Sequence, residues 1–551
     1  MPSLEQHSGE LGISLAGHLL RRSCYNISPT RIETFAQYSI SKGVNILLDT
    51  LPTLALPEPI HPITGEHFLN LGTRNNLDPA EVNGYRRALI KNWWLHEALM
   101  DETVVSKMHF FLHTCFTTAE EGTDQKYFDH VSLLRFYALG NFKVLAEKMC
   151  VDNIMLTYLD NNLNEKDAPN ENFAREFLEL FTIGKGDQVA EGDYTNYTEE
   201  DIQEAARLLT GFKTTGDTDR DNLEKIDSDT NLLKGQTVYS KHDSEDKTFS
   251  HRFDNFTIVG ATSEEDMWRE LHDFVEMIFS KDATAESIVR RLYIHFVGKN
   301  ITSAIHQDII QPLAQDLKED NYELKPVLKR LLKSKHFYGM DGNEPNDTII
   351  GATLRSPLEL WCHSMSMFQI AIPDPVTDAD RHRSFYIGWV RHNFMIPCGM
   401  DLWKPSDVAG YPAYYQTPSF YREWFHSSTI TTRYLLGEML LTGNKIITGG
   451  SLNGVQLDVV PWFVEHFTTD PSNAEWVVTQ FLSYLLPVYP SEDRIAYFLN
   501  EIFLDGLSPL SWFFDNWTPF EASNFTEDSY VRTPLENLIK AIMYAPEYQL
   551  S

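Results

Sequence analysis

The sequence lacks the long apolar runs, the paired cysteines and the excess of basic residues that mark several common protein classes. No apolar stretch reaches the ~18 uninterrupted residues of a membrane-spanning helix, so no membrane span is predicted. The five cysteines include no CxxC pair, which argues against both a disulfide framework and a zinc ribbon. Lysine and arginine number 46 against 78 acidic residues, for a net charge of −32. Because such a surface repels phosphate backbones, we expect no nucleic-acid partner.

Familiar catalytic and export motifs are also missing. The sequence contains no G-x-S-x-G, no Walker A loop and no Rossmann fingerprint, which removes the common motif-bearing hydrolases, NTPases and dehydrogenases. The basic pair Arg21-Arg22 follows the apolar segment 13–20, whereas a signal peptide carries its charge before such a segment. The sequence therefore predicts a cytoplasmic protein.

Apolar and aromatic residues are abundant enough to build large cores. Hydrophobic residues make up 42% of the 551 positions and aromatic residues 12%, so global disorder is excluded. Helical periodicity dominates, and long alternating strand patterns are nearly absent. The sequence predicts an all-α fold, a large multi-helix protein with long irregular loops and little or no β-sheet. The expected helices cover residues 85–116, 131–149, 171–182, 199–210, 264–280, 284–297, 325–336, 352–370, 419–442 and 472–486.

Three stretches interrupt the helical pattern. Residues 50–64 contain four prolines, residues 213–250 are polar and acidic, and residues 340–350 are typical of a loop. The last of these divides the chain into an expected N-terminal helical lobe, 1–340, and a C-terminal helical lobe, 341–551. These lobes could equally form one continuous body.

The segment 169–184 (PNENFAREFLELFTIG) carries the strongest chemical signal. On a helical wheel, its polar residues Glu171, Asn172, Arg175, Glu176 and Glu179 fall within about 140° of arc. The opposite arc holds only apolar residues, namely Phe173, Ala174, Phe177, Leu178, Leu180 and Phe181.

Two interpretations of the polar face remain open. Glu171, Arg175 and Glu179 could form a ladder of surface ion pairs, each contributing about 0.2–0.5 kcal/mol. Alternatively, Glu171, Glu176 and Glu179 could hold a cation or supply a general acid and base, with Arg175 orienting a carboxylate or an anionic substrate. In either case Gly184 is expected to end the helix.

Other candidate ligands lie elsewhere in the sequence. His242 and Asp243 are adjacent in a polar loop and could bind a metal or shuttle a proton. His109 and His113 share a helix face, but Phe110 replaces the glutamate that a zinc protease motif requires.

Two local patterns are predicted to be structural. The Asp217-x-Asp219-x-Asp221 run lacks the glycine and the glutamate of a calcium loop, so it is expected to be a solvated acidic loop. Thr198 and Asp201 are expected to form a capping box, which would start the helix at 199–210.

Taken in order, these segments resemble the large bacterial family called domain of unknown function 1800, over nearly the whole chain. The resemblance rests on the Asn170-Glu-Asn-x-x-Arg-Glu-x-x-Glu179 core and on ordered blocks around it. Those blocks are Trp94…Met108…His113…Phe116, Leu134-Arg135…Ala138-Leu-Gly-Asn-Phe142, Tyr197…Asp201…Ala206-Arg207-Leu-Leu-Thr-Gly211, His242-Asp243…Lys247, Arg355-Ser-Pro-Leu-Glu359, Pro405…Val408-Ala-Gly-Tyr-Pro412 and Ala545-Pro-Glu-Tyr-Gln549.

The family has no established activity, so the resemblance implies architecture and a set of signature residues. Those residues correspond here to Glu171, Arg175, Glu176, Glu179 and the His242-Asp243 pair. Many relatives carry a histidine where this chain has Cys115, and many carry an export signal. Members are often encoded beside a second family, domain of unknown function 1501, which resembles sulfatase- and phosphatase-like proteins. This implies a protein partner, and export together with it as an alternative to a cytoplasmic location.

Three functions are compatible with these observations. The first is an enzyme in which helix 171–182 supplies Glu171, Arg175, Glu176 and Glu179, and His113, His242 and Asp243 hold a divalent metal. The second is a non-enzymatic scaffold or binding partner of the domain of unknown function 1501 protein, with the polar helix face as an ion-pair network. The third is non-covalent haem binding through His113 or His242, since no CxxCH sequence is present.

Overall fold

The computed structural model shows a predominantly helical protein, which confirms the predicted fold class. It describes residues 2–50, 79–120, 122–342, 349–374, 377–411, 423–445, 449–452 and 454–551. The proline-rich prediction for residues 50–64 and most of the loop predicted at 340–350 lie outside the described residues. Among those described, no helix is long and apolar enough to cross a membrane.

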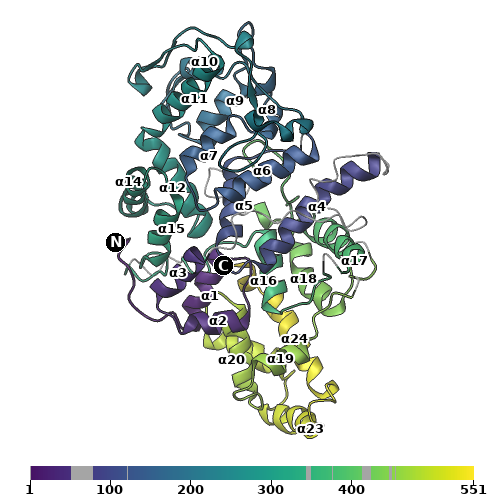
Figure 1. The fold of residues 1–551 in the computed structure, drawn as a ribbon. Helices are drawn as coiled ribbons and strands as arrows, with labels where there is room; N and C mark the ends of the chain where they lie inside the picture. The colour runs from purple at the N-terminus through teal and green to yellow at the C-terminus, as the bar shows by residue number, and fades with distance from the viewer. Residues whose placement is uncertain are drawn as a thin grey trace.

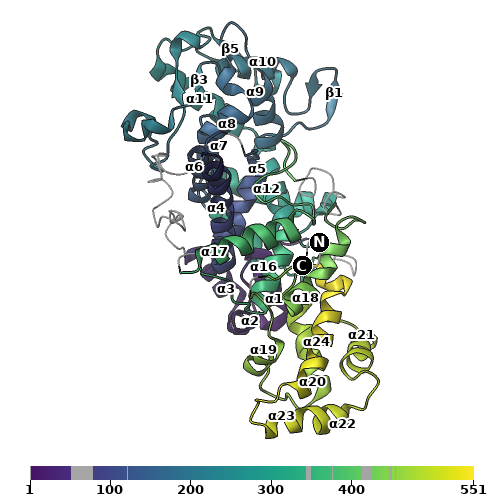
Figure 2. The same ribbon diagram turned by 90° about the vertical axis from the view of Figure 1, so that its right-hand side faces the viewer.

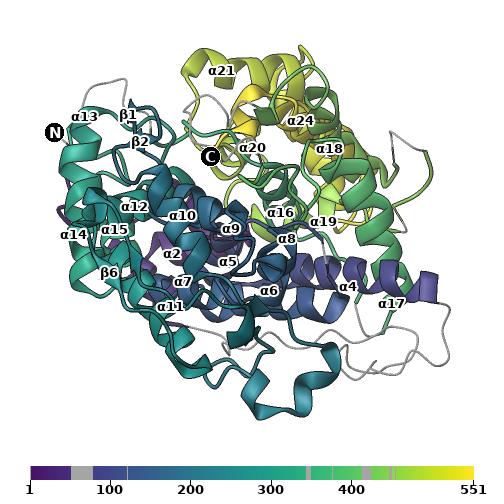
Figure 3. The same ribbon diagram turned by 90° about the horizontal axis from the view of Figure 1, so that it is seen from above.

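The N-terminal helices form the middle of an elongated body (Figure 1). They are α1 (Gly12–Ser23), α2 (Pro29–Ala36), α3 (Ile40–Asp49), α4 (Pro79–Met100), α5 (Val105–Cys115), α6 (Asp124–Phe136), α7 (Phe142–Met149) and α8 (Asn153–Tyr158). Helix α4 projects sideways from this body (Figure 3).

The next helices build one end of the molecule and the flank below it (Figure 1). They are α9 (Asn172–Glu176), the π-helical turn η3 (Phe177–Phe181), α10 (Glu199–Leu208), α11 (Glu264–Phe279), α12 (Asp282–Phe296), α13 (Ser303–Ile305), η8 (His306–Ile310), α14 (Gln311–Glu319) and α15 (Leu324–Lys333).

The C-terminal helices extend to the opposite end (Figure 2). They are α16 (Pro357–Met367), α17 (Ala379–Arg383), η9 (Ser384–Met395), α18 (Ile430–Thr442), α19 (Val459–His466), α20 (Ala474–Leu485), α21 (Glu492–Ala496), η12 (Tyr497–Phe503), α22 (Pro509–Ser511), η13 (Trp512–Trp517), α23 (Thr518–Ala522) and α24 (Ser529–Met543).

The described strands are short, and each pairs with the strand next to it in the sequence. Three antiparallel two-stranded pairs are present among the described residues. They join β1 (Gln188–Ala190) with β2 (Asp193–Tyr194), β3 (Phe212–Lys213) with β4 (Gln236–Thr237), and β5 (Lys247–Thr248) with β6 (Thr257–Ile258). The rest of this loop consists largely of single turns, including η4 (Asp217–Asp221), in which Asp219 caps the turn at Gly216.

Two predicted helices are each divided in two, because short polar side chains cap new helix ends. The predicted helix 85–116 breaks after Met100, where the Asp101 carboxylate accepts hydrogen bonds from the backbone N–H groups of Thr103 and Ser106. The predicted helix 131–149 breaks before Phe142, where Asn141 accepts from the backbone N–H of Val144. Such local hydrogen bonds compete with helical ones and override the apolar periodicity.

Other local predictions hold. Thr198 and Asp201 form the capping box of α10, with each side chain accepting from the other residue's backbone N–H. Gly184 takes a left-handed conformation with φ +76°, and its N–H donates to the carbonyl of Leu178 as the helix ends. The helix predicted at 419–442 begins at Ile430, and residues 412–422 lie outside the described part of the chain.

Helices from both sides of residue 340 pack on one another. Helix α1 packs on α20, and α4 packs on α16. The buried ammonium of Lys107 on α5 pairs with the carboxylate of Glu359 on α16. The division into lobes 1–340 and 341–551 stays a prediction.

Candidate functional site

The predicted helix 171–182 is present as α9 followed directly by η3. Its apolar face is buried except for Leu180, which is partly buried, and Phe177 packs on Phe274 of α11 with ring centroids 5.7 Å apart. Because this face is held in the core, the polar face is oriented toward α10 and the loop that follows η3. The amphipathic pattern thus places Arg175, Glu176 and Glu179 on the outer side of the helix.

Arg175 is a bridge between two helices. Its guanidinium donates to both carboxylate oxygens of Glu199 on α10, at 2.9 and 2.7 Å, and to Glu171 Oε2 at 3.1 Å. This hydrogen bonding lowers the pKa of the Glu199 carboxyl. Of the predicted ladder of ion pairs, the pair between Glu171 and Arg175 is therefore present. The pair between Arg175 and Glu179 is absent, since Arg175 pairs with Glu199.

Glu179 is held by two other donors. Lys185 Nζ lies 3.2 and 3.1 Å from its two carboxylate oxygens, and the hydroxyl of Tyr197 donates to Oε2 at 3.0 Å. Both partners come from segments after η3, so the fold positions this carboxylate from two sides.

Glu176 differs from its neighbours because its carboxyl forms no hydrogen bond or ion pair with any described residue. The side chain is partly buried, and burial together with the negative charge of Glu179 raises its pKa to about 6. Asp407 acts in the same direction, whereas Arg175 and Lys185 oppose it. A carboxyl with a pKa in this range can gain and lose a proton near neutral pH.

A cavity of about 320 Å³ lies beside η3, and Glu179 is among its lining residues whereas Glu176 is not. Its walls come from the end of α5, from η3 and the following residues Gly184–Gly186, from one face of α12, and from Val408 and Ala409. Helices α5 and α12 pack on each other below α9 (Figures 1 and 2). Glu179 and Lys185 line the cavity, and Asp407, one of the charges that act on Glu176, directly precedes Val408. The volume is within the range of small-molecule sites.

His113 lies in the aromatic core and not on the polar face. Its ring centroid is 4.3 Å from that of Trp403, and the side chain is 2% exposed. Burial lowers its pKa well below the ordinary value, so the imidazole is neutral. Neither ring nitrogen has a hydrogen-bond partner among the described residues.

His242 belongs to a separate buried network. Its Nδ1 donates to the carbonyl of Thr210 at 2.8 Å, and its Nε2 lies 2.9 Å from Glu270 Oε2. Lys247 Nζ contacts both oxygens of Glu270 at 3.0 Å. With both nitrogens bonded, His242 has none left for a metal.

Asp243 is likewise engaged, because Arg207 donates to its two oxygens at 2.8 and 3.2 Å. His113 lies in the aromatic core without a hydrogen-bond partner among the described residues, whereas His242 and Asp243 pair with Glu270 and Arg207. The three predicted metal ligands therefore do not form one site. In the part of the chain that the structure describes, no group of three or more His, Cys, Asp or Glu side chains is placed to hold a metal ion.

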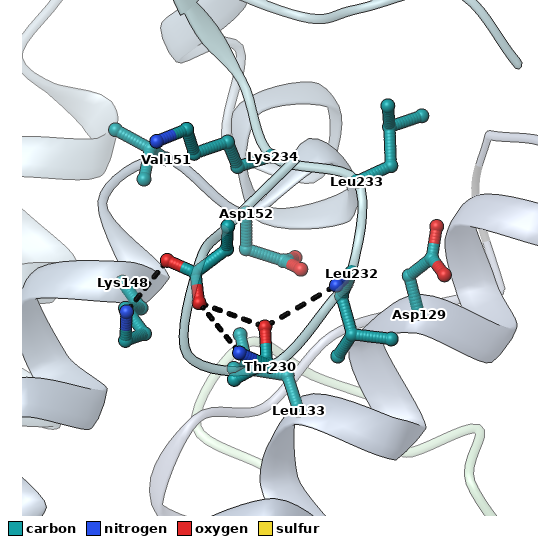
Figure 4. Close-up of a pocket in the computed structure, with 10 residues that line it drawn as sticks. Asp129, Leu133, Lys148, Val151, Asp152, Thr230, Leu232, Leu233 and Lys234 are labelled. Carbon is teal, nitrogen blue, oxygen red and sulfur yellow. Dashed lines mark hydrogen bonds and ion pairs between the residues drawn. The ribbon is translucent and has the colours of Figure 1, made fainter. Parts of the chain in front are cut away.

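A second, much smaller pocket lies between α6, α7 and the loop 227–234 (Figure 4). Its volume is about 20 Å³, which is enough for one water molecule. Its charged groups are already paired: Lys148 with Asp227 at 2.6 Å, and Asp129 with Arg220 at 2.6 Å. This pocket is therefore too small for a substrate.

The sequence-based reasoning missed the basic side chains of the larger cavity. Lys185, Arg290 and Arg291 all line it. The available signals were the adjacent arginines inside the predicted helix 284–297 and the Gly-Lys-Gly sequence after helix 171–182. Neither pattern predicts that helix 284–297 and the Gly184–Gly186 segment lie beside the same cavity.

Comparison with known sequences identifies a family without an assigned activity. The sequence profile of the family described as "Protein of unknown function (DUF1800)" matches residues 18–550. Comparison with curated proteins and with solved structures finds no match.

Proposed function

The chain belongs to the DUF1800 family, and we propose that the cavity beside η3 is the active site of an enzyme in which Glu176 transfers a proton. The observation that carries this proposal is the state of Glu176: an unpaired, partly buried carboxyl whose pKa is raised to about 6, partly by the charge of Glu179, which lines a cavity of small-molecule size. Carboxyl groups with a raised pKa at or near a cavity are typical of general acids and bases.

The neighbouring side chains suit the same role. Glu179 is a second carboxylate, kept in place by Lys185 and Tyr197. Its negative charge contributes to the raised pKa of Glu176. Two carboxyl groups in different environments are a common way to separate acid and base functions. Arg175 acts as a positioning residue, since it fixes α9 against α10 through Glu199.

This proposal keeps the carboxylates of helix 171–182 from the sequence-based hypothesis and leaves out its metal ligands. His113, His242 and Asp243 have structural surroundings of their own, so the acid–base chemistry is assigned to the carboxyl groups of the helix, with Glu176 as the group that transfers the proton. Hydrolysis of a small polar molecule is the simplest reaction that such a group supports.

The test combines a titration with an activity screen. Infrared difference spectra of the wild type minus Glu176→Gln should show one carboxyl that titrates near pH 6. Turnover of chromogenic phosphate, sulfate, acetate and glycoside substrates between pH 5 and 8 should be lost in Glu176→Gln and retained in Glu171→Gln. A Glu176 carboxyl that titrates near pH 4, or activity retained without it, would refute the proposal.

A second candidate function, binding of another protein, is favoured by the surface at the α21–α24 end of the molecule (Figure 2). Large apolar side chains are exposed there by 40–63%: Tyr497, Leu507, Leu510, Phe513, Phe514, Phe525 and Tyr530. The same segments carry acidic residues such as Asp505, Asp515 and Glu521. An apolar surface of this kind with acidic neighbours suits a protein partner that has an apolar groove and a basic rim.

The domain of unknown function 1501 protein implied by the resemblance is the partner that we propose for this surface. Co-purification of the two proteins should be lost when Phe513 and Phe514 are both changed to Ser, with the melting temperature unchanged. Phe256, which is 48% exposed on the 213–263 segment, provides the control as Phe256→Ser. Equal co-purification of both variants would exclude this surface.

A further inference from the structure

The large cavity concentrates positive charge in a protein whose net charge is −32. Three cationic side chains line it, Lys185, Arg290 and Arg291, against the single carboxylate of Glu179. Because Lys185 pairs with Glu179 at 3.1 Å, these two charges largely offset each other. The excess charge at the cavity is therefore that of the two arginines on α12.

Arg291 is held in place by backbone carbonyls. Its guanidinium donates to the carbonyl oxygens of Leu180 and Phe181, at 2.9 and 3.0 Å, where η3 ends. Carbonyl groups fix the side chain but carry no net charge, so they leave its positive charge uncompensated. Arg291 forms no ion pair with a carboxylate among the described residues.

Arg290 is exposed, and its contact is likewise with a group other than a carboxylate. One guanidinium nitrogen lies 3.3 Å from His306 Nδ1, and no carboxylate of the described part of the chain pairs with it. Arg290 is among the residues that line the cavity, and its N–H groups other than the one near His306 have no partner among the described residues. Arginine presents such donors in a geometry that matches phosphate, sulfate and carboxylate groups.

A hydroxyl group completes this wall. Ser287 lies one turn before Arg290 and Arg291 on α12 and lines the same cavity. Its hydroxyl makes no hydrogen bond to any described residue. A Cβ atom at Gly184 would lie 3.6 Å from Ser287 Oγ, so glycine at this position keeps the approach to the hydroxyl open.

We propose that this cavity binds a small organic molecule through an oxyanion group, with Arg290, Arg291 and Ser287 as the groups that recognise it. The inference rests on the proposed function for the location of the site and adds the class of substrate. A phosphate, a sulfate or a carboxylate group would present the same chemistry, namely two or more oxygen acceptors that share a negative charge. A nucleic acid is a poor occupant, because the net charge of −32 on the chain repels a polyanion.

The arrangement also assigns separate tasks to the two sides of the cavity. The arginine side on α12 would anchor the charged end of the substrate. The η3 side, where Glu179 lines the cavity, would face the remainder of the molecule, with Glu176 about one helical turn before it at the end of α9. Binding energy from a charged group remote from the reacting atoms is a common way to position a substrate.

Inorganic sulfate is the first probe, because its charge stays constant between pH 5 and 8. Its binding to the full chain is measured by isothermal titration at low ionic strength, with sodium chloride as the reference. We expect one site in the wild type and a dissociation constant raised at least about tenfold in Arg290→Gln, which corresponds to ~1.4 kcal/mol. Ser287→Ala should weaken binding by a smaller factor.

The matched control is Arg269→Gln on α11, an exposed arginine that contacts Asp266 and Asp273 and lies outside the cavity. This variant should bind sulfate as the wild type does. Equal affinity in Arg290→Gln and Arg269→Gln, or no saturable binding by the wild type, would overturn the proposal. Glycerol 3-phosphate then represents phosphate esters and 3-hydroxybutyrate represents carboxylates. The probe that belongs to the class of the substrate should compete with sulfate and bind more tightly than sulfate.

The inference and the proposed function can fail independently. Glu176→Gln should retain sulfate binding, because its side chain is not among the recognising groups. Arg290→Gln should retain the carboxyl that titrates near pH 6. If the wild type shows no carboxyl that titrates near pH 6, the proton-transfer role of Glu176 fails and the protein remains an anion-binding protein. If only sulfate binding is absent, the proposed substrate class fails and the proton-transfer role stands.

Discussion

His242 Nε2 lies 2.9 Å from Glu270 Oε2, and both side chains are completely buried. This contact joins a loop residue to the middle of α11, and Lys247 completes the network from the same loop. His242 and Lys247 thereby satisfy a carboxylate that is buried in the core.

Glu270→Ala should destabilise the protein by about 3–5 kcal/mol, because it leaves the buried ammonium of Lys247 without its partner. Denaturant unfolding measures the change. The control is Glu171→Ala on the exposed side of α9, which should cost at most about 0.5 kcal/mol. A change below 1 kcal/mol for Glu270→Ala would contradict a structural role for the network.

Glu176→Gln should alter the pH dependence of stability. The folded state raises the pKa of this carboxyl to about 6, above the ~4.3 of an unfolded chain. Its stabilising contribution is therefore complete below about pH 4.3 and is lost as the pH rises through 6.

The free energy of unfolding of Glu176→Gln, relative to the wild type, should therefore be higher at pH 8 than at pH 4, by about 1 kcal/mol after allowance for solvent screening of the partly exposed side chain. Denaturation curves at the two pH values give this difference. If the free energy of unfolding depends on pH in the same way in both proteins, the pKa of the Glu176 carboxyl is not raised in the folded state.

Lys107→Met should be strongly destabilising, because it strands the carboxylate of Glu359 between α5 and α16. Burial by itself would raise the pKa of Glu359, but the ammonium of Lys107 reverses the effect and lowers it. We expect a loss of about 3 kcal/mol in denaturant unfolding, with recovery of at least half in the double variant Lys107→Met/Glu359→Gln. Glutamine keeps the cap on the backbone N–H of Ser356, so the double variant tests the charge pair alone.

Arg175→Ala should cost only about 1 kcal/mol, because its pairs with Glu199 and Glu171 are about one third exposed to solvent. The same variant should bind sulfate with unchanged affinity, since Arg175 does not line the cavity. A large loss of sulfate binding would move the oxyanion site from α12 to α9.

Elemental analysis of protein purified without chelators should find no stoichiometric transition metal. His242 and Asp243 are paired with other side chains, and His113 lies apart from them in the aromatic core, so the three do not form a shared ligand set. If one equivalent of metal were present and lost in His242→Ala, the metal-dependent hypothesis would be restored. His7→Ala, a change near the N-terminus outside these networks, is the control.

Much of the local architecture follows from neighbouring residues alone. The 3.6-residue period of apolar side chains determines that residues 172–181 form one helix with a buried aromatic face. Thr198 and Asp201 specify the start of α10 through hydrogen bonds three residues apart. These features depend on contacts within a turn or two of helix, which the order of the amino acids determines directly.

The partners of the charged groups were decided only by the tertiary structure. Arg175 contacts Glu199, 24 positions away, in preference to Glu179, which is one helical turn distant. Glu179 pairs instead with Lys185, and His242 with Glu270. Spacing along a helix shows which side chains are close enough to pair, whereas the choice among partners depends on which elements pack against that helix.

The cavity is the clearest example of this division. Its walls come from residues 114–117, 179–186, 287–295 and 408–409, segments that lie up to about 300 positions apart. Each segment by itself indicates only a helix end, a glycine-containing turn or an amphipathic face. The sequence alone therefore determined a helical protein with an acidic helix face. Long-range packing of the apolar faces decided that Glu179 of this face borders the same space as Arg290 and Arg291, two arginines without a carboxylate partner among the described residues.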